Sequence, residues 1–93
     1  MAGFTVRVEL HAASADDYDV LHEAMEGAGF SRQISSDAGV SYHLPWAEYN
    51  IEKSLNKSQV CDKANAAAQD TGRSFAILVT ESNGRTWVGL EPA

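Results

Sequence analysis

The stretch FTVRVEL, residues 4–10, alternates apolar and polar side chains and therefore predicts a half-buried β-strand. Its apolar side consists of Phe4, Val6, Val8 and Leu10. Its other side, continued by the next residue of the same parity, carries Thr5, Arg7, Glu9 and His11. A hydroxyl, a cation, a carboxylate and an imidazole in one row indicate that this face of the strand is left open to solvent or to a ligand.

Two helices are predicted after this strand. Ser14 can cap a helix whose first turn is acidic, whose apolar stripe runs from Tyr18 to Ala28, and which glycines end near Gly29. Residues 56–59, Asn-Lys-Ser-Gln, have the form of a capping box and predict a second helix that ends at Gly72.

The segment between the helices predicts a hairpin. Phe30–Ser35 and Val40–Leu44 flank the sequence SDAG, which consists of residues that favour turns. Pro45 then ends regular pairing, and we interpret residues 45–54 as a loop or a short edge strand.

A second hairpin is predicted at the C-terminal end. Ser74–Thr80 and Thr86–Leu90 flank Asn83-Gly84, a pair typical of two-residue hairpin turns. Because directly opposed residues share a face of a sheet, this register assigns to the core Ile77, Val79, Val88 and Leu90. It assigns to the opposite face Leu78, Thr80, Arg85 and Trp87.

This order of elements predicts one α+β domain of the ferredoxin-like type, βαββαβ, over residues 1–93. A four-stranded antiparallel sheet in the order 4-1-3-2 would carry both helices on one face, with an extra short C-terminal strand in a hairpin. The first strand is then central, and its polar side belongs to the open face of the sheet.

The composition is typical of a small globular domain, with 93 residues, 44% hydrophobic residues and a net charge of −6. Most of the negative charge lies in residues 1–29, so the acidity forms one patch. The longest apolar run, Phe75–Val79, is far shorter than the roughly 20 residues that cross a bilayer, so no membrane partner is expected. The single cysteine, Cys61, cannot form an internal disulfide, which agrees with a cytoplasmic location.

The predicted open face gathers residue types that bind single-stranded nucleic acid. The candidate RNA-binding residues are Arg32, His43, Arg85 and Trp87. Arginines would hold phosphates, and the indole would stack on a base. Glu9 and His11 are the candidate general base and general acid, or the ligands of a metal shared across a dimer, and Arg7 is the third catalytic candidate. A solvated strand face, with Trp87 under a dimer partner or under the 45–54 loop, explains the same residues.

Other chemistries are weaker. His11 and His43 cannot form an acid–base pair within one chain. In the predicted sheet His11 lies beside Gly39 and His43 lies beside Thr5. At about 3.4 Å per residue, the two imidazole rings are then well over 10 Å apart. A hard cation could be held by the cluster Glu9, His11, Asp16 and Asp17. The two aspartates also suit a first helical turn, so no metal or other cofactor is assigned and a divalent cation stays open. His22 is interpreted as a solvated residue.

Five stretches of the chain resemble the GhoS family of antitoxins: TVRVELH, DDYDVLHEAMEGAGFSR, YHLPWAEYN, SQVCDKANAAA and SFAILVTESNGRTW. The resemblance extends from Phe4 to Leu90 and consists of general similarity. It implies a ferredoxin-like, Cas2-like fold and a sequence-specific endoribonuclease, which cleaves the messenger RNA of a small membrane-damaging toxin in a type V toxin–antitoxin pair. In Cas2-like proteins an acidic residue ends the first strand, and Glu9 is the nearest equivalent in this chain.

Two functions follow from these observations. The first is an antitoxin-like endoribonuclease that cleaves single-stranded RNA on the open face of the sheet. The second is a non-catalytic module, in which the acidic first helix docks a basic protein or the open face mediates homodimerisation through Trp87. Catalysis requires Arg7, Glu9 and His11 to be exposed close to Arg85, whereas simple dimerisation buries Trp87.

Overall fold

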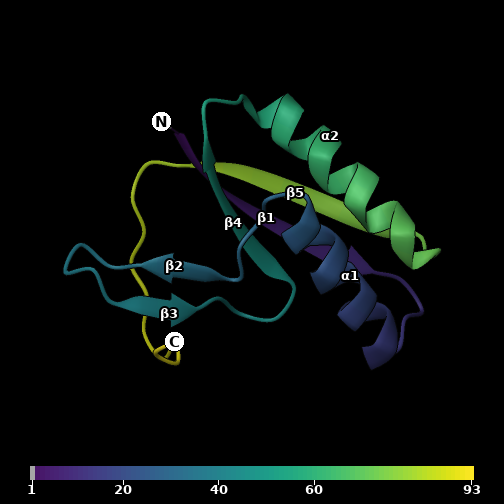
Figure 1. Ribbon diagram of the computed structural model, residues 1–93, viewed down its shortest axis with the longest axis horizontal. Helices are drawn as coiled ribbons and strands as arrows, with labels where there is room; N and C mark the ends of the chain where they lie inside the picture. The colour runs from purple at the N-terminus through teal and green to yellow at the C-terminus, as the bar shows by residue number, and fades with distance from the viewer. Residues whose placement is uncertain (1) are drawn as a thin grey trace.

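The computed structural model describes residues 2–93, and Figure 1 labels its elements in chain order. The strands are β1 Ala2–Leu10, β2 Gln33–Ser35, β3 Ser41–His43, β4 Glu48–Lys53 and β5 Phe75–Ser82. The helices are α1 Ala15–Gly27 and α2 Lys57–Ala68, and α2 continues into the 3-10 helix η1 Gln69–Thr71. The chain is therefore a small α+β protein with antiparallel sheets.

Both helices begin at the predicted caps. The Ser14 hydroxyl accepts a hydrogen bond from the Asp17 amide, and the Asp17 carboxylate accepts one from the Ser14 amide at 2.9 Å. Asn56 and Gln59 form the same reciprocal pair, at 2.8 and 2.9 Å. The 3-10 extension of α2 ends at Gly72, whose φ of +70° is accessible to glycine without strain. Local capping chemistry therefore determines these boundaries.

The main sheet has the order β4-β1-β5, so β1 is central as predicted. The strand beside it is β4, in the position that the sequence analysis gave to Val40–Leu44, so the predicted four-stranded sheet is wrong. The reason is the alternation of Ala47, Tyr49 and Ile51, which are all buried and which bring β4 against Phe4 and Val6 of β1. For residues 45–54 the edge-strand interpretation is confirmed and the loop interpretation is wrong, because β4 forms one edge of the three-stranded sheet while its Tyr49 and Ile51 are buried in the core.

The hairpin between the helices is confirmed, but β2 and β3 form a separate two-stranded sheet. It joins the main sheet through one bridge, in which the Ser31 amide donates to the Asn50 carbonyl at 2.8 Å and the Asn50 amide donates to Ser31 at 2.7 Å. This single bridge replaces the expected fourth strand.

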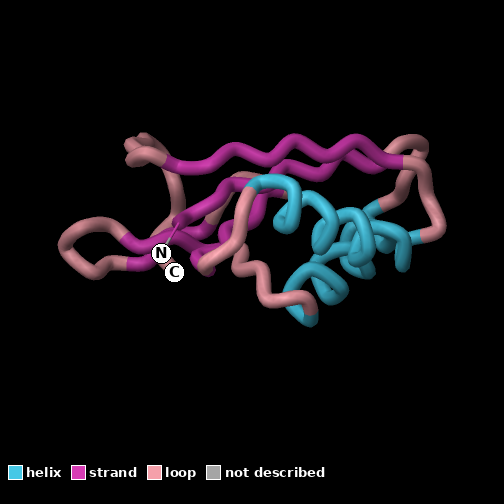
Figure 2. The backbone as a smooth tube through the Cα atoms, turned by 90° about the horizontal axis from the view of Figure 1, so that it is seen from above, coloured by secondary structure: helices cyan, strands magenta, loops and turns pink. Residues whose placement is uncertain are grey.

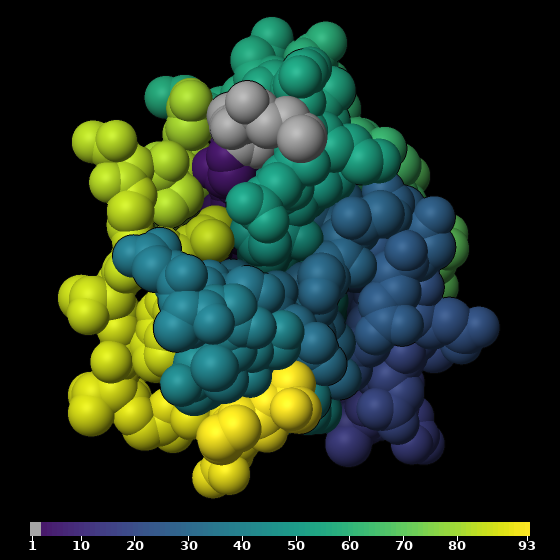
Figure 3. Space-filling model, turned by 60° about the vertical axis from the view of Figure 1, so that its left-hand side comes forward, coloured from purple at the N-terminus to yellow at the C-terminus, as the bar shows by residue number. Residues whose placement is uncertain are grey.

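The predicted C-terminal hairpin is wrong. After β5 the chain leaves the sheet and crosses to β3, where the His43 amide donates to the Glu91 carbonyl and the Ala93 amide to the Ser41 carbonyl, both at 2.9 Å. Figure 3 shows these C-terminal residues, in yellow, lying against the β2–β3 hairpin. Val88, which was expected in the core, is 96% exposed as a result.

One layer of helices covers one face of the main sheet. Figure 2 shows the sheet nearly edge-on, with α1 and α2 on the same side of the strands. The core lies between them and includes Phe4, Val6, Val8, Leu21, Met25, Tyr49, Ile51, Val60 and Ala64. The prediction of two helices on one face is therefore confirmed, and the face that carries Arg7 and Glu9 is left free of helices.

Candidate functional site

The site that the sequence singled out lies at the C-terminal end of β1. Arg7 and Glu9 are exposed between buried residues of the same strand, and His11 follows directly after the strand. His11 Nε2 lies 3.5 Å from Glu9 Oε1. The side chains of Glu9 and His11 are 67% and 49% exposed, so the pair is open to a large ligand. The structure therefore brings together the predicted base and acid.

Ser74, directly before β5, positions the His11 ring. The Ser74 carbonyl accepts a hydrogen bond from the His11 amide at 2.9 Å, and the Ser74 hydroxyl lies 3.3 Å from His11 Nδ1. Because a contact at one ring nitrogen orients the imidazole, Nε2 faces the Glu9 carboxylate. Sequence reasoning missed Ser74, since only the β1–β5 register places it beside His11.

Beside these polar groups, β5 adds an apolar strip to the open face. Leu78 lies opposite Arg7 and is 65% exposed, and Thr80 lies opposite Thr5. The prediction that these β5 residues point away from the core is confirmed. A shallow hollow of about 280 Å³ between the two strands is lined by Arg7, Glu9, Ala76, Ile77 and Leu78.

Arg85 lies on the same face but away from the Glu9–His11 pair. Its guanidinium donates to the Thr5 hydroxyl at 3.0 Å and to the Asn50 side-chain oxygen at 2.9 Å. Thr5 and Glu9 are four residues apart along β1, which corresponds to roughly 13 Å. The expected convergence of Arg85 with the catalytic candidates is therefore wrong, although Arg7 lies between them on the same row.

Three further RNA-binding candidates lie elsewhere. Trp87 is half-buried against the Tyr42 ring at 5.4 Å between centroids, within one chain. His43 is exposed on β3, and neither it nor Gly39 neighbours β1, because β4 occupies that position. The expected neighbours of His11 and His43 are therefore wrong, as is the placement of His43 on the open face of the main sheet.

The third of these candidates, Arg32, belongs to an aromatic cluster against α1. Its guanidinium carbon lies 5.6 Å from the centre of the Trp46 ring, which packs against Tyr18 and His22 at 5.7 and 4.8 Å. Trp46 remains 58% exposed. Arg32 is thus held by a cation–π contact on the helix side, and its placement on the open face is wrong.

His22 is buried at 6% exposure, so its interpretation as a solvated residue is wrong. Its Nδ1 lies 2.5 Å from the Tyr49 hydroxyl, and its Nε2 has no hydrogen-bond partner among residues 2–93. Burial lowers the pKa of His22, and the nearby Arg32 lowers it further. Burial also raises the pKa of Tyr49. The sequence does indicate this burial, because His22 is four residues after Tyr18 and three before Met25, a spacing that places it on the apolar face of the helix.

The proposed cation cluster does not form. Asp17 is occupied by the Ser14 cap and by Arg73, whose Nε donates to it at 3.0 Å. These contacts, the Ser14 amide first, lower the pKa of Asp17. In the part of the chain that the structure describes, no three His, Cys, Asp or Glu side chains gather closely enough to hold a metal.

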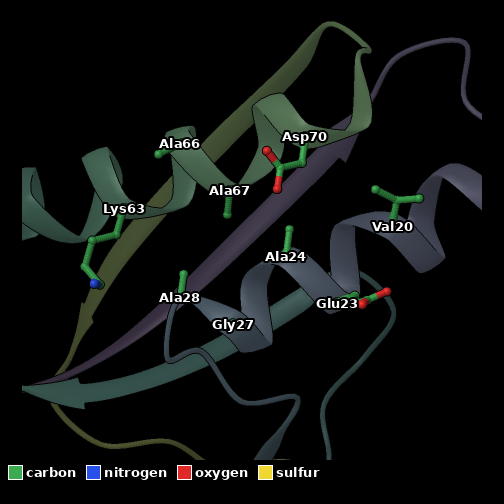
Figure 4. Close-up of a pocket in the computed structure, with 9 residues that line it drawn as sticks. All are labelled: Val20, Glu23, Ala24, Gly27, Ala28, Lys63, Ala66, Ala67 and Asp70. Carbon is green, nitrogen blue, oxygen red and sulfur yellow. The ribbon is translucent and has the colours of Figure 1, made fainter.

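A groove of about 640 Å³ runs between α1 and α2 on the far side of the protein from Arg7. Figure 4 shows that its lining residues come from both helices and are mostly small, with Ala24 and Ala67 near its centre. Glu23 and Asp70 also line it. This groove is the surface on which the acidic helix would meet a partner.

A scan against protein-family models and a search of curated proteins each found no match to this chain. No helix among residues 2–93 is long and apolar enough to cross a membrane. The functional argument therefore rests on the geometry of the site.

Proposed function

We propose that the chain is an antitoxin-like endoribonuclease that cleaves single-stranded RNA at Glu9, His11 and Arg7. The observation that carries this proposal is the exposed Glu9–His11 pair, with 3.5 Å between Oε1 and Nε2. Arg7 lies two residues before Glu9 on the same face of β1. A base, an acid and a cation within one short row are the groups that phosphodiester transfer requires. Arg85, which was expected close to them, lies roughly 13 Å away, so Arg7 supplies the cation of this row.

In the proposed reaction, the Glu9 carboxylate removes the proton from a ribose 2′-hydroxyl. The 2′-oxygen attacks the adjacent phosphorus, and protonated His11 donates its Nε2 proton to the departing 5′-oxygen. The products are a 2′,3′-cyclic phosphate and a free 5′-hydroxyl. Arg7 stabilises the extra negative charge on the phosphate oxygens in the transition state. Ser74 holds the His11 ring at Nδ1 while the proton leaves Nε2.

The same face offers a path for the RNA chain. Arg85, Arg7 and the Glu9–His11 pair follow one another along β1, so two cations precede the reacting groups. Leu78 presents apolar surface beside Arg7, against which an unstacked base can pack, although it has no aromatic ring for the stacking that was expected of Trp87. Single-stranded RNA is the favoured substrate because only unstacked bases can lie on such a surface.

We further infer that the fold is an open variant of the ferredoxin-like arrangement. The order β5-β1-β4, followed by the Ser31–Asn50 bridge, matches the order 4-1-3-2 if the second strand is reduced to that bridge. This inference and the proposed activity agree with the resemblance to the GhoS antitoxins. Cas2-like proteins carry an acidic residue at the end of the first strand, and Glu9 is the nearest equivalent in this chain. A cytoplasmic location is part of the same proposal.

The test is cleavage of a mixed single-stranded RNA pool by purified protein, with and without Mg²⁺. Glu9→Gln and His11→Asn are each expected to slow cleavage by about 100-fold or more, the usual contribution of a general base or acid. His43→Asn is the matched control, because His43 is also exposed but lies on β3, and this variant should cut at the wild-type rate.

Two results would overturn the proposal. Equal cleavage by all four proteins would identify a contaminating nuclease. A wild-type protein that cuts no RNA under any condition would favour the second function, for which the groove lined by Glu23 and Asp70 is the specific surface.

A further inference from the structure

The outer edge of β5 has no partner strand among residues 2–93. β5 pairs with β1 alone, over eight consecutive residue pairs from Gly3↔Ser82 to Leu10↔Phe75. The opposite edge of β5 therefore presents a row of free backbone amides and carbonyls. Such an edge is a template for pairing with another chain.

The devices that usually protect an edge strand are missing from β5. Residues 74–80 contain no charged residue and no proline, and the first charge is that of Glu81. The register with β1 is continuous, so no bulge turns the strand away. A long, flat, uncharged edge is unusual on a protein that remains a monomer.

Apolar surface of β5 is exposed on the open face and only partly buried on the helix side, where α2 packs against the strand. On the open face, Leu78 is 65% exposed. On the helix side, Ile77 and Val79 are only partly buried, whereas Val6 and Val8 of the neighbouring β1 are fully buried. The sheet is therefore incomplete beyond β5 in its hydrogen bonds and in its packing.

We propose that β5 pairs antiparallel with β5 of a second copy of this chain, about a two-fold axis through Leu78. The occupant is a second copy because an antiparallel strand edge is self-complementary under a two-fold rotation. The two main sheets then form one continuous sheet in the order β4-β1-β5-β5-β1-β4. This pairing does not depend on the proposed ribonuclease activity.

The register follows from the faces of the sheet. Directly opposed residues must share a face, so the axis has to pass through a residue and not between two. Leu78 is the large apolar residue of β5 that is exposed, and an axis there places it against its own mate. The same axis opposes Ile77 to Val79 and Ala76 to Thr80, so core-facing residues meet core-facing residues.

The distribution of charge also favours β5 as the contact between two copies of the chain. The chain carries a net charge of −6, so two copies repel one another over most of their surface. Along β5 no charged side chains are opposed, because Glu81 falls beside Phe75 of the partner. The two Glu81 side chains are then about 20 Å apart along the strands, given six residues between them.

The pairing would complete the hollow on the open face. That hollow is lined by Arg7, Glu9 and Leu78 and has no wall beyond β5. In the dimer the second β5 supplies that wall, and the two Arg7 residues lie on one face, three strand spacings or about 14 Å apart. If the proposed ribonuclease function holds, one RNA strand can cross both sites.

The first test is the mass of the full chain in solution, measured by sedimentation over a range of concentrations. We expect a concentration-dependent dimer for wild type and a dissociation constant raised at least tenfold by Leu78→Lys, which places two like charges on the axis. Val88→Lys is the matched control, because Val88 is 96% exposed but lies outside β5, and its dimer should be unchanged. A wild type that stays monomeric, or a dimer that tolerates Leu78→Lys, overturns the proposal.

The second test reads the register. In a Cys61→Ser background, Leu78→Cys should form a covalent dimer on oxidation, because opposed residues have Cα atoms about 4.5–5.5 Å apart, within disulfide range. Thr80→Cys should not, because each Thr80 faces Ala76 of the partner. Cross-linking of Thr80→Cys without cross-linking of Leu78→Cys would overturn the axis. Both tests are independent of RNA cleavage, so failure of either proposal can be told from failure of the other.

Discussion

The two edge strands of the main sheet, β4 and β5, differ in what lies against their outer sides. Beyond β4, the Ser31–Asn50 bridge and the β2–β3 hairpin cover the edge of the strand, and the Arg85 guanidinium bonds to Asn50 on the open face. Beyond β5, no strand among the described residues pairs with the outer edge, and Ile77 and Val79 stay partly buried although α2 packs against the strand. One edge is closed by segments distant in sequence, and the other is a regular strand with its hydrogen-bonding groups free.

This difference explains which strand is essential to the monomer. β4 carries Tyr49 and Ile51 into the core, where both are buried between β1 and the helices. β5 contributes apolar residues that are buried on one side only, so its stabilisation by the monomer is incomplete. The β4 edge therefore belongs to folding, and the β5 edge is available for association.

The largest expected effect contrasts the same substitution at the two edges. Ile51→Ala on β4 should lower the free energy of unfolding by about 2–5 kcal/mol, the usual range for a fully buried isoleucine. Ile77→Ala on β5 should cost roughly half as much, because part of its surface is already in water. Denaturant unfolding at low protein concentration measures both. Equal losses would show that β5 is as well covered as β4.

A smaller effect on the free energy of unfolding is expected when the Arg85 hydrogen bonds beside β4 are removed. Arg85→Ala removes the bonds to Thr5 and Asn50 and leaves the buried Asn50 side-chain oxygen without a partner, at a cost of about 1–2 kcal/mol. Arg73→Ala is the control, because solvent screens its surface pair with Asp17, so this variant should change stability little. Faster hydrogen exchange at the Ala93 amide in Arg85→Ala alone would show that the C-terminal segment has loosened. No difference between the variants would contradict this role of Arg85.

The smallest expected effect is a pH dependence that His22 adds beside the β4 edge. Burial first, and Arg32 second, lower its pKa, while Asp19 and Glu26 act in the opposite direction. The unfolded chain therefore binds a proton at His22 more tightly than the folded chain does. The free energy of unfolding is highest at pH values above 6.5, the ordinary pKa of histidine. It falls as the pH drops below that value and levels off once the folded protein is also protonated.

Denaturant unfolding between pH 7.5 and 5 checks this slope. His22→Gln should flatten it, and His43→Gln, which changes an exposed histidine, should leave it intact. A slope that persists in His22→Gln would assign the pH dependence to another group.

The amino-acid sequence by itself determined the features that depend on neighbouring residues. The alternation in residues 4–10 predicts β1 and its polar face, and the Ser14 and Asn56 caps predict where the helices begin. Glu9 and His11 could be paired in advance because they are two residues apart on one side of a strand. Each of these features needs only the period of a strand or the hydrogen bonds of a helix end.

Only the tertiary structure decided which strand lies beside β1 and where the C-terminal segment goes. Residues 40–44 and 48–53 both alternate, and the burial of Tyr49 and Ile51 in the core selected the second. The Asn83-Gly84 pair favours a hairpin turn, but no hairpin forms, because Arg85 and Trp87 make contacts with distant residues instead. Such choices compare packing energies between segments far apart in the chain, and a local pattern holds no information on that comparison.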